Sequence, residues 1–199
     1  MSDFAPLFEP FTLKGVTFAN RLAMAPMTRS FATGGVPGQN VADYYSRRAA
    51  ADVGLLITEG TTINRGGASF DPNIPNIHAD EAKAGWKHVV DEVHANNGKI
   101  APQIWHVGMA RKPGQGPHPE AQSDSPSGVT HAGKQVYETP TLDDVDAMIE
   151  AFVDGIVTAK GHLSFDEVSG AIVKAVDWFV SDPGRAAEVL GAVQSEATA

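Results

Sequence analysis

Three short apolar segments of the chain each lead into residues that could hold a small ligand. These residues are Ala25-Pro26-Met27-Thr28, Glu59-Gly60-Thr61 and Gln103-Ile104-Trp105-His106. Together they offer a hydroxyl group, a glycine that permits close approach to its backbone, and an amide that both donates and accepts hydrogen bonds. Groups of this kind suit a flat ring system rich in hydrogen-bonding atoms, such as isoalloxazine.

Each of these residues also has an ordinary structural explanation. Pro26 and Gly60 are typical of residues that simply end strands, and Trp105 and His106 are typical of a core and of a structural hydrogen bond. Gln103 is harder to explain in this way, because burying an amide without partners costs about 1–3 kcal/mol. Taken from the residues alone, the ligand-binding and the structural interpretations both stay open.

Parallel strands are the elements that would bring these segments together. The spacing predicts strands at Leu22–Ala25, Leu55–Thr58 and Ile100–Ile104, separated by helices at Val41–Ala51 and Glu81–Asn97. Strands that alternate with helices indicate βαβ units, and ligands bind at the carboxyl ends of such strands. A barrel and an open doubly wound sheet both agree with this order.

Further elements flank this region. A hairpin is predicted within Leu7–Phe18, with Gly15 in its turn, and Thr141 is predicted to cap a helix that runs to about Lys160. Beyond it, Phe165–Val180 and Pro183–Val193 are predicted to be helical, and no strand is predicted there.

Composition and charge disfavour several classes of function. The chain has 199 residues, with 15 Lys and Arg against 24 Asp and Glu, and a net charge of −9 that disfavours binding to nucleic acid. It has no cysteine, which excludes disulfides and thiolate metal sites, and its histidines form no His-x-x-x-His pair. No signal peptide is recognisable, and no apolar stretch approaches the roughly 20 residues of a membrane helix. We therefore expect a cytoplasmic protein with no metal, membrane or nucleic-acid partner.

Several motifs, in order along the chain, resemble those of one enzyme family. They are Asn20-Arg21-Leu22-Ala23-Met24-Ala25-Pro26-Met27-Thr28-Arg29, Tyr44-Tyr45-Ser46-Arg47-Arg48-Ala49, Leu56-Ile57-Thr58-Glu59-Gly60-Thr61, Gln103-Ile104-Trp105-His106-Val107-Gly108, Ser125-Pro126-Ser127 and Glu138-Thr139-Pro140. They resemble the old yellow enzyme family, the NADH:flavin oxidoreductases, over roughly Pro6 to Lys160.

The resemblance implies a (β/α)₈ TIM barrel that holds FMN. Similar proteins reduce their FMN with NAD(P)H and pass the hydride to activated alkenes, quinones or nitro compounds. By resemblance, the residues expected to bind the cofactor are Ala25, Pro26, Met27, Thr28, Gly60 and Gln103, and those expected to bind a small-molecule substrate are Thr28 and Trp105. The resemblance further implies that Thr28 bonds a flavin carbonyl oxygen and that Gln103 bonds the pyrimidine edge of the ring.

The chain departs from the family pattern after Lys160. Similar proteins carry a His-x-x-Asn or His-x-x-His pair there, followed by a tyrosine that donates a proton. Here His162 is followed by Phe165 and Glu167 at those positions, and we assign no catalytic residue. A closed barrel also needs about 250 residues. We therefore expect a partial barrel of about three β/α units in residues 1–160, with a helical tail in residues 161–199.

Three hypotheses about function follow. The first is a truncated oxidoreductase that is impaired when alone. The second is one part of an enzyme that a second chain or a second copy completes through the open edges of the barrel. The third is a non-catalytic binding module whose helical tail covers an open sheet edge.

Overall fold

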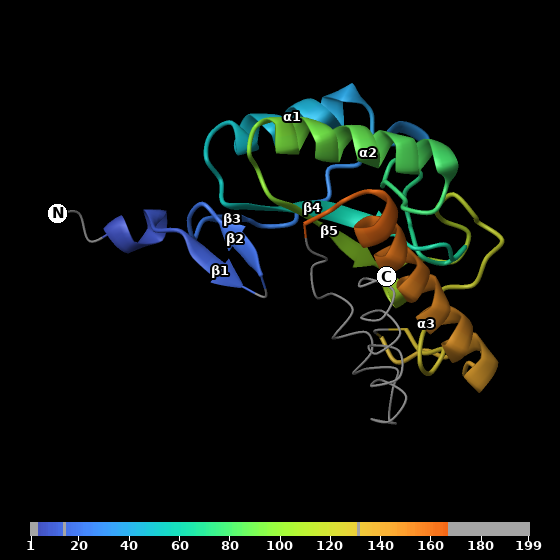
Figure 1. Ribbon diagram of the computed structural model, residues 1–199. Helices are drawn as coiled ribbons and strands as arrows, with labels where there is room; N and C mark the ends of the chain where they lie inside the picture. The colour runs from blue at the N-terminus through green and yellow to red at the C-terminus, as the bar shows by residue number, and fades with distance from the viewer. Residues whose placement is uncertain (1–3, 14, 131, 167–199) are drawn as a thin grey trace.

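A computed structural model describes residues 4–13, 15–130 and 132–166 of the chain (Figure 1). The strands are β1 (Phe11–Leu13), β2 (Val16–Phe18), β3 (Ala23–Met24), β4 (Leu55–Thr62) and β5 (Ile100–Trp105). The α-helices are α1 (Gln39–Ala49), α2 (Asp80–Ala95) and α3 (Leu142–Val157). Short 3₁₀ turns lie at Ala5–Phe8, Thr33–Gly35 and Gly108–Ala110, and a π-helical turn at Thr158–His162 extends α3.

The strands form two separate sheets. β1 and β2 make an antiparallel hairpin, which lies to one side of the other elements in Figure 1. β3, β4 and β5 form a parallel sheet in that order. Among the described residues, β3 and β5 each pair only with β4, so the sheet does not close. This is the predicted partial barrel with its N-terminal hairpin.

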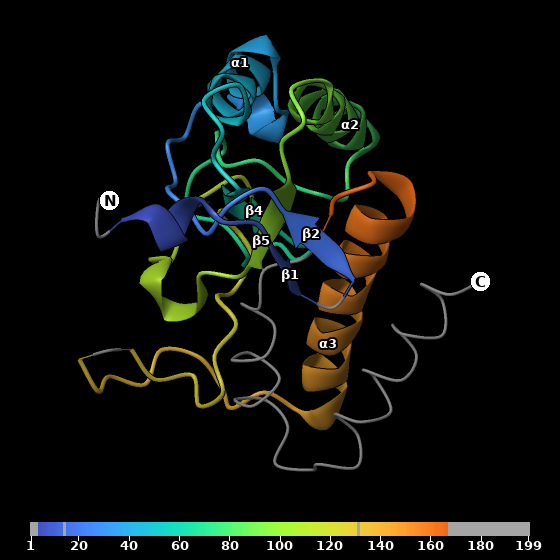
Figure 2. The ribbon, with the colours of Figure 1, turned by 60° about the vertical axis from the view of Figure 1, so that its left-hand side comes forward.

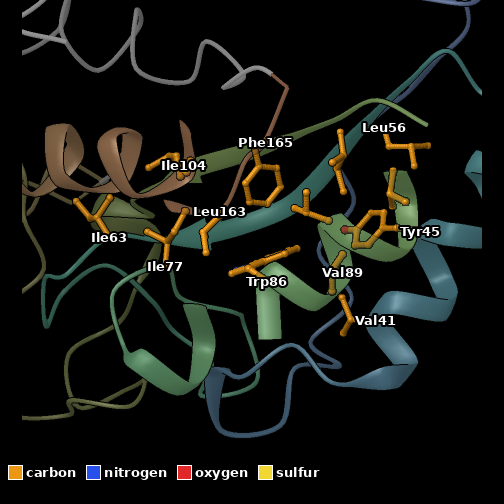
Figure 3. Close-up of a cluster of buried hydrophobic side chains, with 14 of the residues drawn as sticks. Val41, Tyr45, Leu56, Ile63, Ile77, Trp86, Val89, Ile104, Leu163 and Phe165 are labelled. Carbon is orange, nitrogen blue, oxygen red and sulfur yellow. The ribbon is translucent and has the colours of Figure 1, made fainter. Parts of the chain in front are cut away.

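The helices α1 and α2 lie side by side on one face of the parallel sheet (Figure 2). Val41 and Tyr45 of α1, Trp86 of α2 and Leu56 of β4 are fully buried between the two layers (Figure 3). The indole Nε1–H of Trp86 donates to the carbonyl oxygen of Asn76 at 3.1 Å, so this large side chain is buried without leaving a polar atom unpaired.

The chain returns to this core after α3. Leu163 and Phe165 are buried, and the ring of Phe165 lies 5.7 Å from that of Trp86 (Figure 3). Phe165 and Asp166 are not helical, in contrast to the predicted helix Phe165–Val180. Burial of Phe165 against Trp86 holds this stretch in an irregular conformation. The rest of that helix and the predicted helix Pro183–Val193 lie outside the described residues.

The ends of two helices show how well local signals predicted the structure. Thr141 caps α3 as predicted, in a capping box with Asp144. At the end of α2, however, Asn97 rather than Gly98 takes the left-handed conformation, with a φ of 57°. Gly98 is needed for a different reason, because a Cβ atom there would lie 2.5 Å from the Cβ of Ala49.

Two strand boundaries also differ from the prediction. Leu7 and Phe8 belong to a 3₁₀ turn rather than to the hairpin, and β4 continues to Thr62. The prediction ended β4 at Thr58 because polar residues follow, but Glu59 and Thr61 are buried by tertiary packing. None of the helices in the described part is long and apolar enough to cross a membrane.

Candidate functional site

The carboxyl ends of β4 and β5 carry three of the predicted site residues on the face opposite α1 and α2. Gly60 pairs with Gln103 across the two strands, and Trp105 lies two residues further along β5 on the same face. Gln103 and Trp105 are half-buried. The parallel topology therefore brings Gly60, Gln103 and Trp105 together, as expected from the sequence.

A β-bulge in β4 sets this arrangement. Between the paired positions Ile57 and Gly60, β4 has two residues, Thr58 and Glu59, where β5 has only Pro102. The hydroxyl of Thr58 accepts the backbone N–H of Gln103 at 3.1 Å, which satisfies a donor that the irregular ladder would leave free. Bulges of this kind re-aim side chains and are common beside active sites.

Gly60 lies directly beneath the indole ring of Trp105. A Cβ atom at Gly60 would lie 2.2 Å from two ring atoms of Trp105, so no larger residue fits without moving the indole. The indole Nε1–H of Trp105 is buried and has no hydrogen-bond partner among the described residues. The sequence does not predict this contact between Trp105 and Gly60. It predicts only that the glycine lets a ring come close to its backbone.

The segment after β3 reaches the same edge of the sheet. The backbone N–H of Arg29 donates to the carboxylate of Glu59 at 3.2 Å, which places the chain just after Thr28 beside the residue just before Gly60. Ala25, Met27 and Thr28 are exposed and Pro26 is half-buried. In the described part of the chain, neither the Thr28 hydroxyl nor the Gln103 amide has a hydrogen-bond partner. Polar groups able to bind a ligand are therefore free at this edge.

Glu59 and Arg29 are members of the site that the sequence interpretation did not select. The carboxylate of Glu59 is fully buried and lies 2.5 Å from the guanidinium of Arg29. The Arg29 guanidinium in turn lies 3.6 Å from the centre of the Tyr44 ring. A charged residue in an apolar strand was a signal of such a pair, since a buried carboxylate needs a partner.

Tyr45 ties the pair to α1. Its hydroxyl oxygen accepts the backbone N–H of Glu59 at 2.8 Å. Burial raises the pKa of Tyr45 far above its usual value, and the nearby Glu59 carboxylate raises it further. Tyr45 therefore stays protonated, and its hydroxyl oxygen supports the backbone of Glu59.

A second polar cluster lies beyond the end of β5. His106 Nδ1 accepts the backbone N–H of Gly108, so its Nε2 carries the proton that is donated to Asp124 at 2.8 Å. Arg65 also bonds to Asp124. Burial alone would raise the pKa of Asp124, but the hydrogen bonds from His106 and Arg65 outweigh it and lower the pKa below its usual value. His106 is thus held by hydrogen bonds on both ring nitrogens, as the structural interpretation of this residue predicts.

This cluster lies at one wall of a polar cavity of about 630 Å³. Arg65, Asp124, Tyr137 and Asp144 are among the residues that line it. None of the predicted cofactor residues lines this cavity, so the site at the strand ends and the cavity are separate features. No group of three or more residues able to hold a metal ion occurs within the described residues.

The chemical groups of the strand-end residues are of the kinds that suit one face of a flavin ring. A free hydroxyl, a free amide, a glycine and a buried indole N–H converge there, and ring systems with carbonyl and imide groups need such partners. The fold is a segment of a parallel α/β barrel, a class of fold in which ligands bind at the carboxyl ends of the strands.

Comparison with known proteins agrees with this class. Residues 6–173 match the profile of the NADH:flavin oxidoreductase / NADH oxidase family. The flavin oxidoreductase hxnT of Emericella nidulans is 34% identical over 195 residues, which cover 92% of this chain and 50% of that protein. A protein described as probable inactive reductase easA, from Epichloe festucae var. lolii, is 35% identical over 89% of this chain and 47% of its own length.

Solved structures show the same relationship. Morphinone reductase in complex with tetrahydroNAD superposes with a TM-score of 0.71 at 32% identity, over 81% of this chain and 48% of that one. The Old Yellow Enzyme from Pichia sp. AKU4542 gives a TM-score of 0.74 at 28% identity, over 82% of this chain and 45% of that one.

The chain belongs to the NADH:flavin oxidoreductase / NADH oxidase family, the family of old yellow enzyme. It spans about half the length of these relatives. The family match also continues past Lys160, to residue 173.

Proposed function

We propose that this chain forms the flavin-facing part of an FMN-dependent oxidoreductase that takes hydride from NAD(P)H and delivers it to an activated alkene, quinone or nitro compound. In this proposal residues 1–160 carry the part of the barrel that contacts the flavin ring. The residues that hold the FMN phosphate and protonate the substrate would belong to the part of the fold that this chain does not span.

The observation that carries the proposal is the meeting of free polar groups at one edge of the sheet. Thr28, Gly60 and Gln103 come from three different strand ends, and the backbone bond from Arg29 to Glu59 joins the first of these ends to the second. The Thr28 hydroxyl is exposed and the Gln103 amide half-buried, so both are accessible to the polar atoms of a ring.

The proposed roles follow from the chemistry of each group. Ala25, Pro26 and Met27 would lie against the ring, and the Thr28 hydroxyl would donate to a ring carbonyl oxygen. Gly60 would offer its backbone, and the Gln103 amide would bond the pyrimidine edge. Trp105 would form one wall for the substrate. When bound, FMN supplies the hydride chemistry, and these residues orient it.

The test is FMN binding by the full chain, followed by an activity assay. We expect the purified protein to quench added FMN fluorescence and to show a flavin absorption band. Gln103→Ala should weaken binding, whereas Gln135→Ala, which alters a glutamine in the loop before α3, serves as the matched control. Oxidation of NADPH with a cyclic enone as acceptor then tests turnover. Failure of the wild-type chain to bind FMN would refute the proposal for this chain alone.

A second candidate function is one part of a two-chain enzyme. The specific observation that favours it is the open sheet, since β3 and β5 pair only with β4 within the described residues. Open parallel edges invite pairing with another chain. Size-exclusion chromatography with light scattering tests self-association. A protein that stays monomeric, yet binds FMN and turns over, would rule this candidate out.

A further inference from the structure

The most deeply buried charge at the strand-end site has no part in the roles proposed so far. The Glu59 side chain has no exposed surface, and that of Arg29 is 13% exposed. An acid in such a place is unusual and needs strong partners. Its surroundings therefore indicate what it does.

Glu59 holds Arg29 at two points. One carboxylate oxygen lies 2.5 Å from the guanidinium, and the other accepts the backbone N–H of Arg29 at 3.2 Å. The second bond is the informative one, because it fixes the main chain rather than a flexible side chain. The residue just before Arg29 is Thr28, and the residue just after Glu59 is Gly60.

The bulge in β4 explains why Glu59 can reach this position. Thr58 and Glu59 together oppose Pro102, so Glu59 turns toward α1 while Gly60 stays on the opposite face beside Gln103. In a strand without the extra residue, side chains alternate strictly between the two faces of the sheet. Glu59 would then lie on the face away from α1, and Gly60 on the face toward it. The bulge thus puts a buried carboxylate directly behind the ligand face.

Helix α1 supplies a rigid base for the pair. The Arg29 guanidinium lies 3.6 Å from the centre of the Tyr44 ring, and the guanidinium of Arg48 lies 3.5 Å from the same centre. Tyr45 accepts the N–H of Glu59. Both members of the pair are therefore anchored to one helix as well as to each other.

We propose that Glu59 and Arg29 are positioning residues of this site. Their contact fixes Thr28 relative to Gly60 and so sets how these two groups meet the ring of the flavin. The inference rests on the proposed function for its flavin, but the contact itself is tested separately in the flavin-free protein. If the pair only stabilised the fold, its removal would lower the affinity for flavin no more than another substitution that costs the same free energy of unfolding.

The decisive variant replaces both residues at once, Arg29→Met with Glu59→Met. Exchanging a buried ion pair for apolar residues of similar volume is often neutral for stability, so this variant keeps the fold while it removes the contact. Glu59→Gln is the single-site variant. Asp91→Asn removes a surface carboxylate of α2 and controls for charge, and Val93→Ala controls for loss of core stability.

Two readouts are measured on the full chain. The first is hydrogen–deuterium exchange of the backbone amide at position 29 without flavin. The second is the dissociation constant for FMN, from fluorescence quenching, together with the reduction potential of bound FMN. We expect the double variant to speed exchange at position 29 and weaken FMN binding by about tenfold or more, the change that loss of one charge-assisted hydrogen bond gives. Glu59→Gln keeps an oxygen that can accept the Arg29 N–H, so it should change both quantities in the same direction but less. The two controls should stay within about threefold of wild type.

The outcomes separate the two proposals. A double variant that melts near the wild-type temperature and binds FMN with unchanged affinity and potential would overturn the positioning role. Exchange at position 29 that is equally fast in wild type and variants would overturn it as well, whether or not FMN binds. A wild-type chain that protects this amide but binds no FMN would refute the proposed function, and with it the flavin part of this inference, and leave the Glu59–Arg29 contact supported.

Discussion

The two faces of the parallel sheet differ sharply in how they are packed. On the face toward α1 and α2, Leu56, Ile100 and Ile104 are fully buried. On the other face, Ile57 and Gln103 are only half-buried, although they belong to the same strands. Parallel sheets are normally covered on both faces. Among the described residues, the large apolar side chains of β4 and β5 that are fully buried lie on the face toward α1 and α2, whereas the unpaired amide of Gln103 lies on the other face.

The largest expected effect is on the free energy of unfolding, in variants of two neighbouring residues whose side chains point to opposite faces of the sheet. Leu56→Ala should lower the free energy of unfolding by about 2–5 kcal/mol, because it leaves a cavity in the core. Ile57→Ala should cost only about 1 kcal/mol, because its side chain already meets solvent. Urea denaturation of both variants measures the difference. Equal costs would show that both faces are packed and would remove the distinction.

The second prediction concerns the two glycines on either side of the sheet. Gly60→Ala should destabilise the chain by about 1–3 kcal/mol, because its Cβ would meet the indole of Trp105 at 2.2 Å. Gly155→Ala in α3 is the matched control. Its Cβ would make ordinary contacts, the nearest at 3.4 Å to Ile104, so the better helix propensity of alanine should stabilise the chain by up to about 1 kcal/mol.

The contact of Gly60 with Trp105 can be checked by a double variant. If the indole causes the strain, adding Trp105→Ala should recover most of the stability lost in Gly60→Ala. A double-mutant cycle of thermal unfolding measures this recovery. Additive effects of the two changes would contradict this explanation.

A smaller effect is expected at the start of β5, where Asp166 joins the chain after α3 to the sheet. Its carboxylate bonds to Lys99 and His94 at 2.9 Å each and accepts the N–H of Ile100. Burial alone would raise its pKa, but Lys99, the Ile100 N–H and His94 outweigh it and lower the pKa below its usual value. Asp166→Asn should cost about 1–2 kcal/mol at neutral pH.

The sign of the pH dependence follows from that lowered pKa. Because the folded-state value lies below the unfolded value of about 3.9, the ionised carboxylate stabilises the fold above that pH. The contribution is lost as the pH falls through the folded-state pKa. The stability curves of wild type and Asp166→Asn should therefore converge in acid, and curves that stay parallel would exclude this role.

Much of the fold and part of the site followed from local patterns. The strands, the helices α1, α2 and α3 and the cap at Thr141 were predicted because apolar spacing and capping residues act over a few neighbouring positions. The helix predicted to begin at Phe165 was wrong at Phe165 and Asp166, where packing against Trp86 decides the conformation. The meeting of Gly60 with Gln103 was also predictable, since parallel strands must align their carboxyl ends. The prediction that the ligand is FMN came from the family motifs and not from the spacing of the residues.

Only the tertiary structure decided the remaining features of the site. The bulge at Thr58 and Glu59 depends on how β4 pairs with β5, and the contact of Trp105 with Gly60 depends on a side-chain conformation. The bond from Glu59 to Arg29 joins residues 30 positions apart. Such contacts are set by packing between elements, so the sequence determined which groups gather at the strand ends and the fold decided which of them touch.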